Sequence, residues 1–153
     1  MRPELEVEAA VADGFQLPVA TEVVEAAVRH VLAAEGVEAA EISMAFVGDA
    51  EIARMNEGYL AHEGATDVIS FALHAEGERP LGDIYVGVEQ AARQAAEMQV
   101  PPEEELLRLA IHGTLHVLGY DHPVDVEREG SPMYIRQEAL LASFLERIRP
   151  AGR

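Results

Sequence analysis

The stretch EEELLRLAIHGTLHVLGYDH, residues 103–122, organises the chain around it. Three glutamates open it, and acidic side chains favour the first turn of a helix because the helix dipole leaves that end partly positive. Gly119 suits the other end, since glycine readily adopts the left-handed backbone that terminates many helices. The pattern predicts a helix over 103–119 packed on a sheet. Its predicted sheet-facing residues are Leu107, Ala110, Ile111, Thr114, Leu115 and Leu118.

Three of the chain's six histidines, His112, His116 and His122, lie in this stretch. Residues four apart on a helix project from one face, about 6 Å apart, so His112 and His116 can share one cation. A left-handed turn at Gly119 can swing the chain back and place His122 beside them. This spacing has a chance frequency on the order of 10⁻³ in a chain of this composition, which outweighs the usual risk of an accidental motif.

Three imidazoles from one segment would form an open metal site, with the fourth position left to water or substrate. The chain has no cysteine, which excludes disulfides and thiol catalysis and leaves His, Asp and Glu as metal ligands. A doubly charged ion on neutral imidazoles can lower the pKa of bound water from ~16 toward ~7 and can stabilise phosphoryl oxygens. The candidate catalytic and metal-binding residues are therefore the same three histidines, with one transition-metal ion per chain.

Working outward from the histidine segment, apolar and β-branched runs predict four strands. We expect the first to lie at a sheet edge and the third to be buried. The predicted strands are 5–12, 40–48, 66–73 and 83–88.

Helical periodicity predicts five helices, with Asp49 capping the second and Ser131–Pro132 opening the last. We expect His30, in the first helix, to be exposed. The predicted helices are 20–36, 50–60, 89–99, 103–119 and 133–148.

The resulting order β-α-β-α-β-β-α-α-α indicates an α+β fold. No repeat or convincing linker interrupts it, so we expect one domain over residues 1–153. We expect a four-stranded mixed β-sheet packed with about five helices, and a metal site on a helix and the turn after it.

The charge balance is strongly acidic, with a net charge of −17 from 28 acidic against 11 basic residues. Such a surface repels nucleic acid at long range, because non-specific affinity comes from Lys and Arg on phosphates. We expect no DNA partner. No apolar run approaches the roughly 18 residues that span a membrane, so we expect no membrane association. The acidic N-terminus lacks a signal pattern, which favours a cytoplasmic location.

The histidine spacing equals that of the metzincin metallopeptidases, H-E-x-x-H-x-x-G-x-x-H. Those enzymes use the glutamate after the first histidine as general base, and that position is Gly113 here. Met133 lies downstream as a Met-turn methionine would, although a buried core methionine is the simpler interpretation. A metallopeptidase is therefore the weaker alternative.

The segment HGTLHVLGYDH, residues 112–122, closely resembles the signature H-G-x-L-H-L-x-G-Y-D-H of the YbeY family, bacterial endoribonucleases of ribosomal RNA maturation. Residues 55–71, MNEGYLAHEGATDVISF, are similar to the family's L-N-x-x-Y-R-x-x-D-x-P-T-D-V-L-S-F. Residues 81–86, LGDIYV, resemble its third block, L-G-D-I. The resemblance spans residues 40–145 or so, in order.

The resemblance implies a small α+β domain, with zinc as the usual metal on His112, His116 and His122. It implies metal-dependent cleavage of single-stranded RNA, in 3′-end maturation of small-subunit 16S ribosomal RNA and in ribosome quality control. The implied partners are ribosomal RNA and the small ribosomal subunit or its proteins, which are generally basic and could meet the acidic exterior. The alternative is a non-catalytic, metal-bearing ribosome-assembly factor.

One departure from the family concerns phosphate binding. The family's arginine after the tyrosine, thought to serve RNA cleavage in the cleft, is Leu60 here. Arg54 or Arg79 could reach the cleft in its place. We therefore expect Leu60 to limit cleavage.

Several polar residues near the motifs have two interpretations each. Asp121 is either a second-sphere partner that holds an imidazole or a turn-forming residue. Asp67 and Ser70 lie on a strand that the family blocks place near the cleft, and Asp67 is either a second-sphere or a structural residue. Asn56 is expected to fix backbone geometry.

Overall fold

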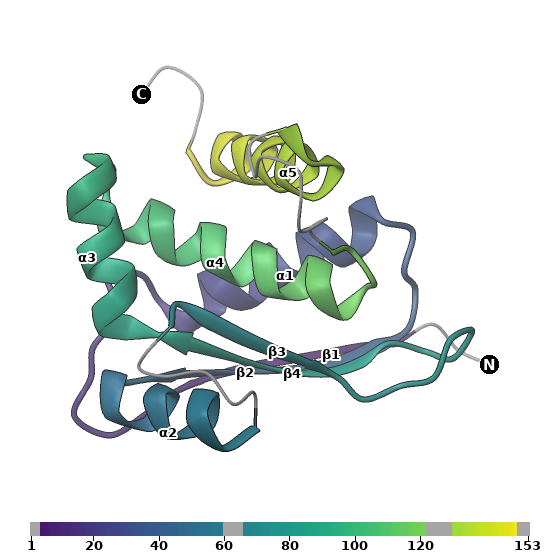
Figure 1. The fold of residues 1–153 in the computed structure, drawn as a ribbon. Helices are drawn as coiled ribbons and strands as arrows, with labels where there is room; N and C mark the ends of the chain where they lie inside the picture. The colour runs from purple at the N-terminus through teal and green to yellow at the C-terminus, as the bar shows by residue number, and fades with distance from the viewer. Residues whose placement is uncertain (1–3, 60–65, 122–129, 150–153) are drawn as a thin grey trace.

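The computed structural model describes residues 4–59, 66–121 and 130–149. These residues form four strands and five helices in the order that the sequence predicts (Figure 1). The elements are β1 (Leu5–Val11), α1 (Thr21–Ala34), β2 (Ala40–Val47), α2 (Asp49–Tyr59), β3 (Val68–Ala72), β4 (Leu81–Gly87), α3 (Val88–Met98), α4 (Pro102–Val117) and α5 (Pro132–Ile148).

The strands form one mixed sheet in the order β1-β2-β4-β3. β1 pairs with β2, and β2 with β4, in parallel, whereas β3 pairs antiparallel to β4. The predicted mixed sheet and the edge position of β1 are confirmed. The expectation of a buried third strand is wrong, because β3 forms the opposite edge and buries only Ile69.

The helices cover the two faces of the sheet unequally. Figure 1 shows α1, α3, α4 and α5 on one face and α2 alone on the other. Alternate residues of β4 serve the two layers: Ile84 and Val86 join the large core under α1 and α4, whereas Tyr85 packs with Ile52 of α2 and Ile69 of β3. Each fully buried Ile or Leu of this kind stabilises the fold by roughly 1.5–3 kcal/mol.

The helix α4 lies close on the sheet because two glycines leave room for it. A Cβ added at Gly113 of α4 would lie 2.6 Å from Cγ2 of Ile84. A Cβ added at Gly82 of β4 would lie 2.6 Å from Cγ1 of Val117. Neither contact is tolerated by a real side chain, so the two glycines set how closely α4 approaches β4.

Two helix starts test the predicted caps. Ser131 caps α5 as predicted, since its Oγ accepts the backbone N–H of Tyr134 at 3.1 Å and Pro132 begins the helix. The predicted cap at Asp49 is wrong: Asp49 is the first residue of α2, and its carboxylate accepts two hydrogen bonds of 2.9 Å from Arg93. Asp49 therefore ties α2 to α3, because a guanidinium fork matches both carboxylate oxygens.

Candidate metal centre

His112 and His116 lie on successive turns near the C-terminal end of α4. Their ring centroids are 4.8 Å apart and the ring planes cross at 79°. The two rings are neighbours, as the four-residue spacing predicts. His112 is only 6% exposed, whereas His116 is partly exposed, so the pair joins a buried ring to one that reaches the surface.

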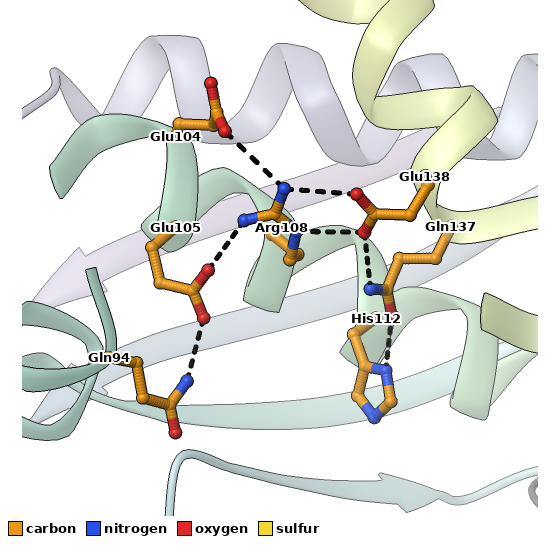
Figure 2. A network of polar contacts seen from close by, with 7 residues as sticks. All are labelled: Gln94, Glu104, Glu105, Arg108, His112, Gln137 and Glu138. Carbon is orange, nitrogen blue, oxygen red and sulfur yellow. Dashed lines mark hydrogen bonds and ion pairs between the residues drawn. The ribbon is translucent and has the colours of Figure 1, made fainter. Parts of the chain in front are cut away.

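The hydrogen bond of His112 decides which of its ring nitrogens can bind a metal ion. Nδ1 lies 2.6 Å from the amide oxygen Oε1 of Gln137, on α5 (Figure 2). An amide oxygen only accepts, so Nδ1 carries the proton and Nε2 keeps the lone pair. The imidazole is therefore in the tautomer that ligates through Nε2, with its other nitrogen hydrogen-bonded as in most metal-binding histidines.

The turn after α4 reverses the chain direction as the sequence predicts. Gly119 adopts a φ of +103°, its N–H donates to the carbonyl of His116 at 3.0 Å, and the N–H of Tyr120 donates to the carbonyl of Leu115 at 3.0 Å. This pair of bonds is the Schellman motif, which satisfies the last helical carbonyls. The chain thus turns back directly before His122.

The third predicted ligand, His122, lies outside the described residues, as does Leu60. Within 4–59, 66–121 and 130–149, no three His, Cys, Asp or Glu side chains are grouped as a metal site. The donors that are described fit a transition-metal ion, because they are two adjacent imidazoles and one has its tautomer fixed for ligation through Nε2. The described part of α4 thus supplies two of the three predicted ligands.

Two predicted polar residues of the third strand have structural roles. Ser70 Oγ donates to the carbonyl of Gly113 at 3.1 Å and so joins β3 to the turn of α4 that separates the two histidines. Asp67 Oδ1 accepts the backbone N–H of Val68 at 2.8 Å, which fixes the start of β3. Of the two roles considered for Asp67, this contact corresponds to the structural one.

Of the two predicted substitutes for the family arginine, Arg54 lies on the other side of the sheet from the histidine pair. Arg54 pairs with Glu51 and lines a hollow with Tyr85, on the α2 face of the sheet. Arg79 is exposed in the turn between β3 and β4. The proposal that Arg54 reaches the site is wrong, because the sheet separates α2 from α4.

His116 opens onto a hollow of about 450 Å³ between the end of α4 and the β3–β4 turn. His74, which the sequence reasoning set aside, also lines it, and its Nδ1 accepts the N–H of Leu81 at 3.1 Å. Glu76 and Glu78 make the lining acidic, and no arginine of the described residues contributes to it. Positive charge for a phosphate must therefore come from a bound metal ion or from residues outside the described ranges.

Gln137 is the site residue that the sequence reasoning missed, and one signal was present. It lies at helical spacing within an otherwise apolar stripe of α5, between Met133 and Leu141, and is only 1% exposed. A buried glutamine needs hydrogen-bond partners, so its place in such a stripe indicates a polar contact across the helix interface. Met133 itself is 1% exposed and is the core methionine that was expected.

Comparison with known proteins gives consistent matches. The family model described as Endoribonuclease YbeY matches residues 11–145. A curated relative named Endoribonuclease YbeY, from Geobacillus thermodenitrificans, is 41% identical over 135 residues, which cover 80% of this chain and 85% of the relative. One of the same name from Moorella thermoacetica is 43% identical over 122 residues, covering 72% and 77%.

Among solved structures, a solution structure of a Thermotoga maritima protein matches with a TM-score of 0.61. It is 24% identical in sequence, and the match covers 92% of this chain and 89% of the other. At that identity the match shows the shared fold.

Proposed function

The chain belongs to the YbeY family, and from that premise we propose that it is a metal-dependent endoribonuclease that cuts single-stranded RNA in ribosomal RNA processing. The observation that carries the proposal is the adjacent pair His112 and His116 at the end of α4, with one tautomer fixed for ligation. His122 follows the reversing turn at Gly119 and completes the proposed ligand set.

The proposed ion is zinc, one per chain, on His112, His116 and His122. When bound, such an ion supplies Lewis-acid chemistry: it activates water and stabilises charge on phosphoryl oxygens. The chain's own residues fix where this happens. His112 is held from behind by Gln137, and His116 faces the hollow through which a phosphodiester can approach.

Peptide hydrolysis fits this site poorly. The metzincin general base would stand at position 113, but the α-carbon of Gly113 faces Ile84 and Ser70 of the sheet, without room for a side chain. A carboxylate at this position would point into the core rather than toward the metal ligands. The packing of α4 thus supports a nuclease over a peptidase.

The proposed substrate must approach a strongly acidic molecule. With a net charge of −17, the surface repels RNA, so the metal ion supplies the local attraction and basic ribosomal proteins supply the docking contacts. No helix in the described part of the chain is long and apolar enough to cross a membrane. These features support action on the small ribosomal subunit, and we place that action in the cytoplasm.

The test is cleavage of a labelled single-stranded RNA at low salt by zinc-loaded protein. We expect the wild type to cut and His116→Ala to fall to background, because two imidazoles bind the ion weakly. His30→Gln is the matched control, since it also removes a histidine but lies on α1, and it should cut like the wild type above pH 7.

Equal cleavage by His116→Ala and the wild type would contradict the proposal. If the wild type holds one metal ion per chain but cuts no RNA, either free or on small ribosomal subunits, the assembly-factor function replaces the nuclease.

A further inference from the structure

We propose that Gln137 is a positioning residue for the proposed metal ligand His112, and that a partly buried chain of hydrogen bonds running back to Arg108 fixes its orientation. This inference rests on the proposed metal site. It is carried by contacts between α4 and α5 that the histidine spacing alone does not reveal (Figure 2).

The amide of Gln137 is fixed at both ends. Its oxygen lies 2.6 Å from Nδ1 of His112, and its Nε2 donates to Oε2 of Glu138 at 2.9 Å. A flipped amide would turn its NH₂ toward the histidine and its oxygen toward a carboxylate, which is repulsive. Glu138 therefore determines that an acceptor, and not a donor, faces His112.

Glu138 is in turn held by Arg108 of α4. Arg108 Nε donates to Oε2 of Glu138 at 2.9 Å, and its Nη2 donates to Oε1 at 3.1 Å. Such a two-pronged pair fixes the carboxylate plane as well as its distance. Because Arg108 and His112 are four residues apart on α4, the helix that bears the histidine also anchors the far end of the chain of contacts.

Arg108 also donates to a second glutamate, Glu105, on its own helix. Its Nη1 donates to Oε1 of Glu105 at 2.7 Å, and Glu105 is only 2% exposed. The second oxygen of Glu105 accepts Nε2 of Gln94, on α3, at 2.8 Å. Figure 2 shows the network spanning α3, α4 and α5. The guanidinium thus cannot rotate away from Glu138 without breaking its ion pair with the buried carboxylate of Glu105, which is costly.

The direction of the hydrogen bonds gives the network its function. The donors converge on the Glu138 carboxylate from both sides: the guanidinium of Arg108 donates to it from one side, and on the other side the Gln137 amide N–H donates to it and Nδ1–H of His112 donates to the amide oxygen. His112 is left with its lone pair on Nε2, and its ring is oriented before any ion arrives. Residues that hold a metal ligand in this way typically contribute 10–100-fold to metal affinity.

A purely structural role for Gln137 predicts something else. A core residue can be replaced by another of similar volume with only a small loss of stability and no effect on a histidine tautomer. The two roles are therefore separated by the proton position on His112 and by metal affinity, and neither readout depends on RNA cleavage.

The experiment begins with metal-free wild type. Long-range ¹H–¹⁵N correlation spectra should show His112 as the Nδ1–H tautomer. Gln137→Met, which keeps the volume but removes the acceptor, should lose this preference and bind zinc about 10–100-fold more weakly in chelator competition. Leu140→Met, a buried change on the same helix, is the control and should behave like the wild type.

The inference is overturned if metal-free wild type has the proton on Nε2, or if folded Gln137→Met keeps both the tautomer and the zinc affinity. The wild-type spectrum decides even if Gln137→Met fails to fold. Failure of the proposed function shows differently: the wild type would then bind no zinc or cut no RNA, while the tautomer of His112 would still be read in metal-free protein.

Discussion

Gly113 stands between the two histidines of α4 with its α-carbon against β4. Three atoms crowd the place where a Cβ would lie: Ile84 Cγ2 at 2.6 Å, Ser70 Oγ at 3.1 Å and Val68 Cγ2 at 3.2 Å. Side chains of both β3 and β4 therefore lie against this one position. The glycine brings α4 close to the sheet and, at the same position, removes the base that a peptidase would need.

We predict that Gly113→Ala destabilises the fold by about 1–3 kcal/mol, because overpacking outweighs the gain in helix propensity of up to ~1 kcal/mol. Urea denaturation measures the change. Gly58→Ala is the matched control: it lies on the exposed side of α2 with no atom within 4 Å of the added Cβ, and should stabilise by about 0.4–1 kcal/mol. A Gly113→Ala protein as stable as the wild type would refute the close packing of α4.

At this scale the sequence was informative where spacing along one helix sufficed. The neighbouring rings of His112 and His116 follow from four-residue periodicity, and the turn at Gly119 from its place after the helix. Gln137 could not be assigned to His112, since 25 residues separate them and only the packing of α5 on α4 brings them together. Burial of a polar residue was visible in the pattern, but its partner was not.

At the scale of elements, α1 and α5 meet through His30. Its ring stands 5.5 Å from that of Phe144, and it lies between Ser143 and Arg147 of α5. Arg147 donates to Nδ1 at 2.9 Å, so Nε2 carries the proton and donates to Ser143 Oγ at 2.8 Å. The expectation of an exposed histidine is wrong, because α5 partly covers the ring.

This contact should make stability depend on pH. Burial, and then the charges of Arg147 and Arg136, lower the pKa of His30 below its ordinary value of 6.5. The unfolded chain therefore takes up the proton more readily, and His30 makes the fold lose stability as the pH falls through 6.5 and below, with no effect well above it.

We predict that His30→Gln reduces the loss of thermal stability between pH 7.5 and pH 5.5, the window set by that lowered pKa. Melting temperatures of both proteins at the two pH values measure it, and subtracting the two slopes cancels the contribution of the carboxylates. Equal slopes for the two proteins would show that His30 does not titrate differently in the fold.

The order of helices and strands along the chain was predicted correctly, whereas the neighbours of each strand in the sheet were not predictable from the sequence. The apolar run at 66–73 indicated a strand but not its neighbours. β3 is apolar because Val68 packs toward α4 and Ile69 toward α2, although only β4 pairs with it. An apolar run indicates apolar contacts on both faces, and an edge strand between two helices also makes such contacts, even though only Ile69 of β3 is buried. Likewise β4 begins at Leu81, two residues before the predicted start, where a bond of 2.7 Å from Leu73 N to Leu81 O closes the turn.

At the scale of the whole molecule, the acidic surface charge and the proposed metal site together determine how RNA approaches the protein. Glu6 and Glu41 are register partners on β1 and β2. Hydrogen bonding with Glu41, and then with Glu4, raises the pKa of Glu6, as expected where carboxylates crowd one another. Regions so acidic repel RNA, and the repulsion is screened over about 10 Å at 0.1 M salt. On our proposal, attraction of a phosphodiester is therefore local to the proposed metal site at the end of α4.

Whether the histidines of α4 hold the ion that cuts RNA is tested most directly by titrating zinc into metal-free protein while following cleavage of a labelled single-stranded RNA. We predict that the rate rises in proportion to added zinc, stops rising at one equivalent per chain, and does not rise with His116→Ala. A metal-free protein that cuts as fast as the loaded one, or a His116→Ala protein that responds to zinc like the wild type, would contradict the account.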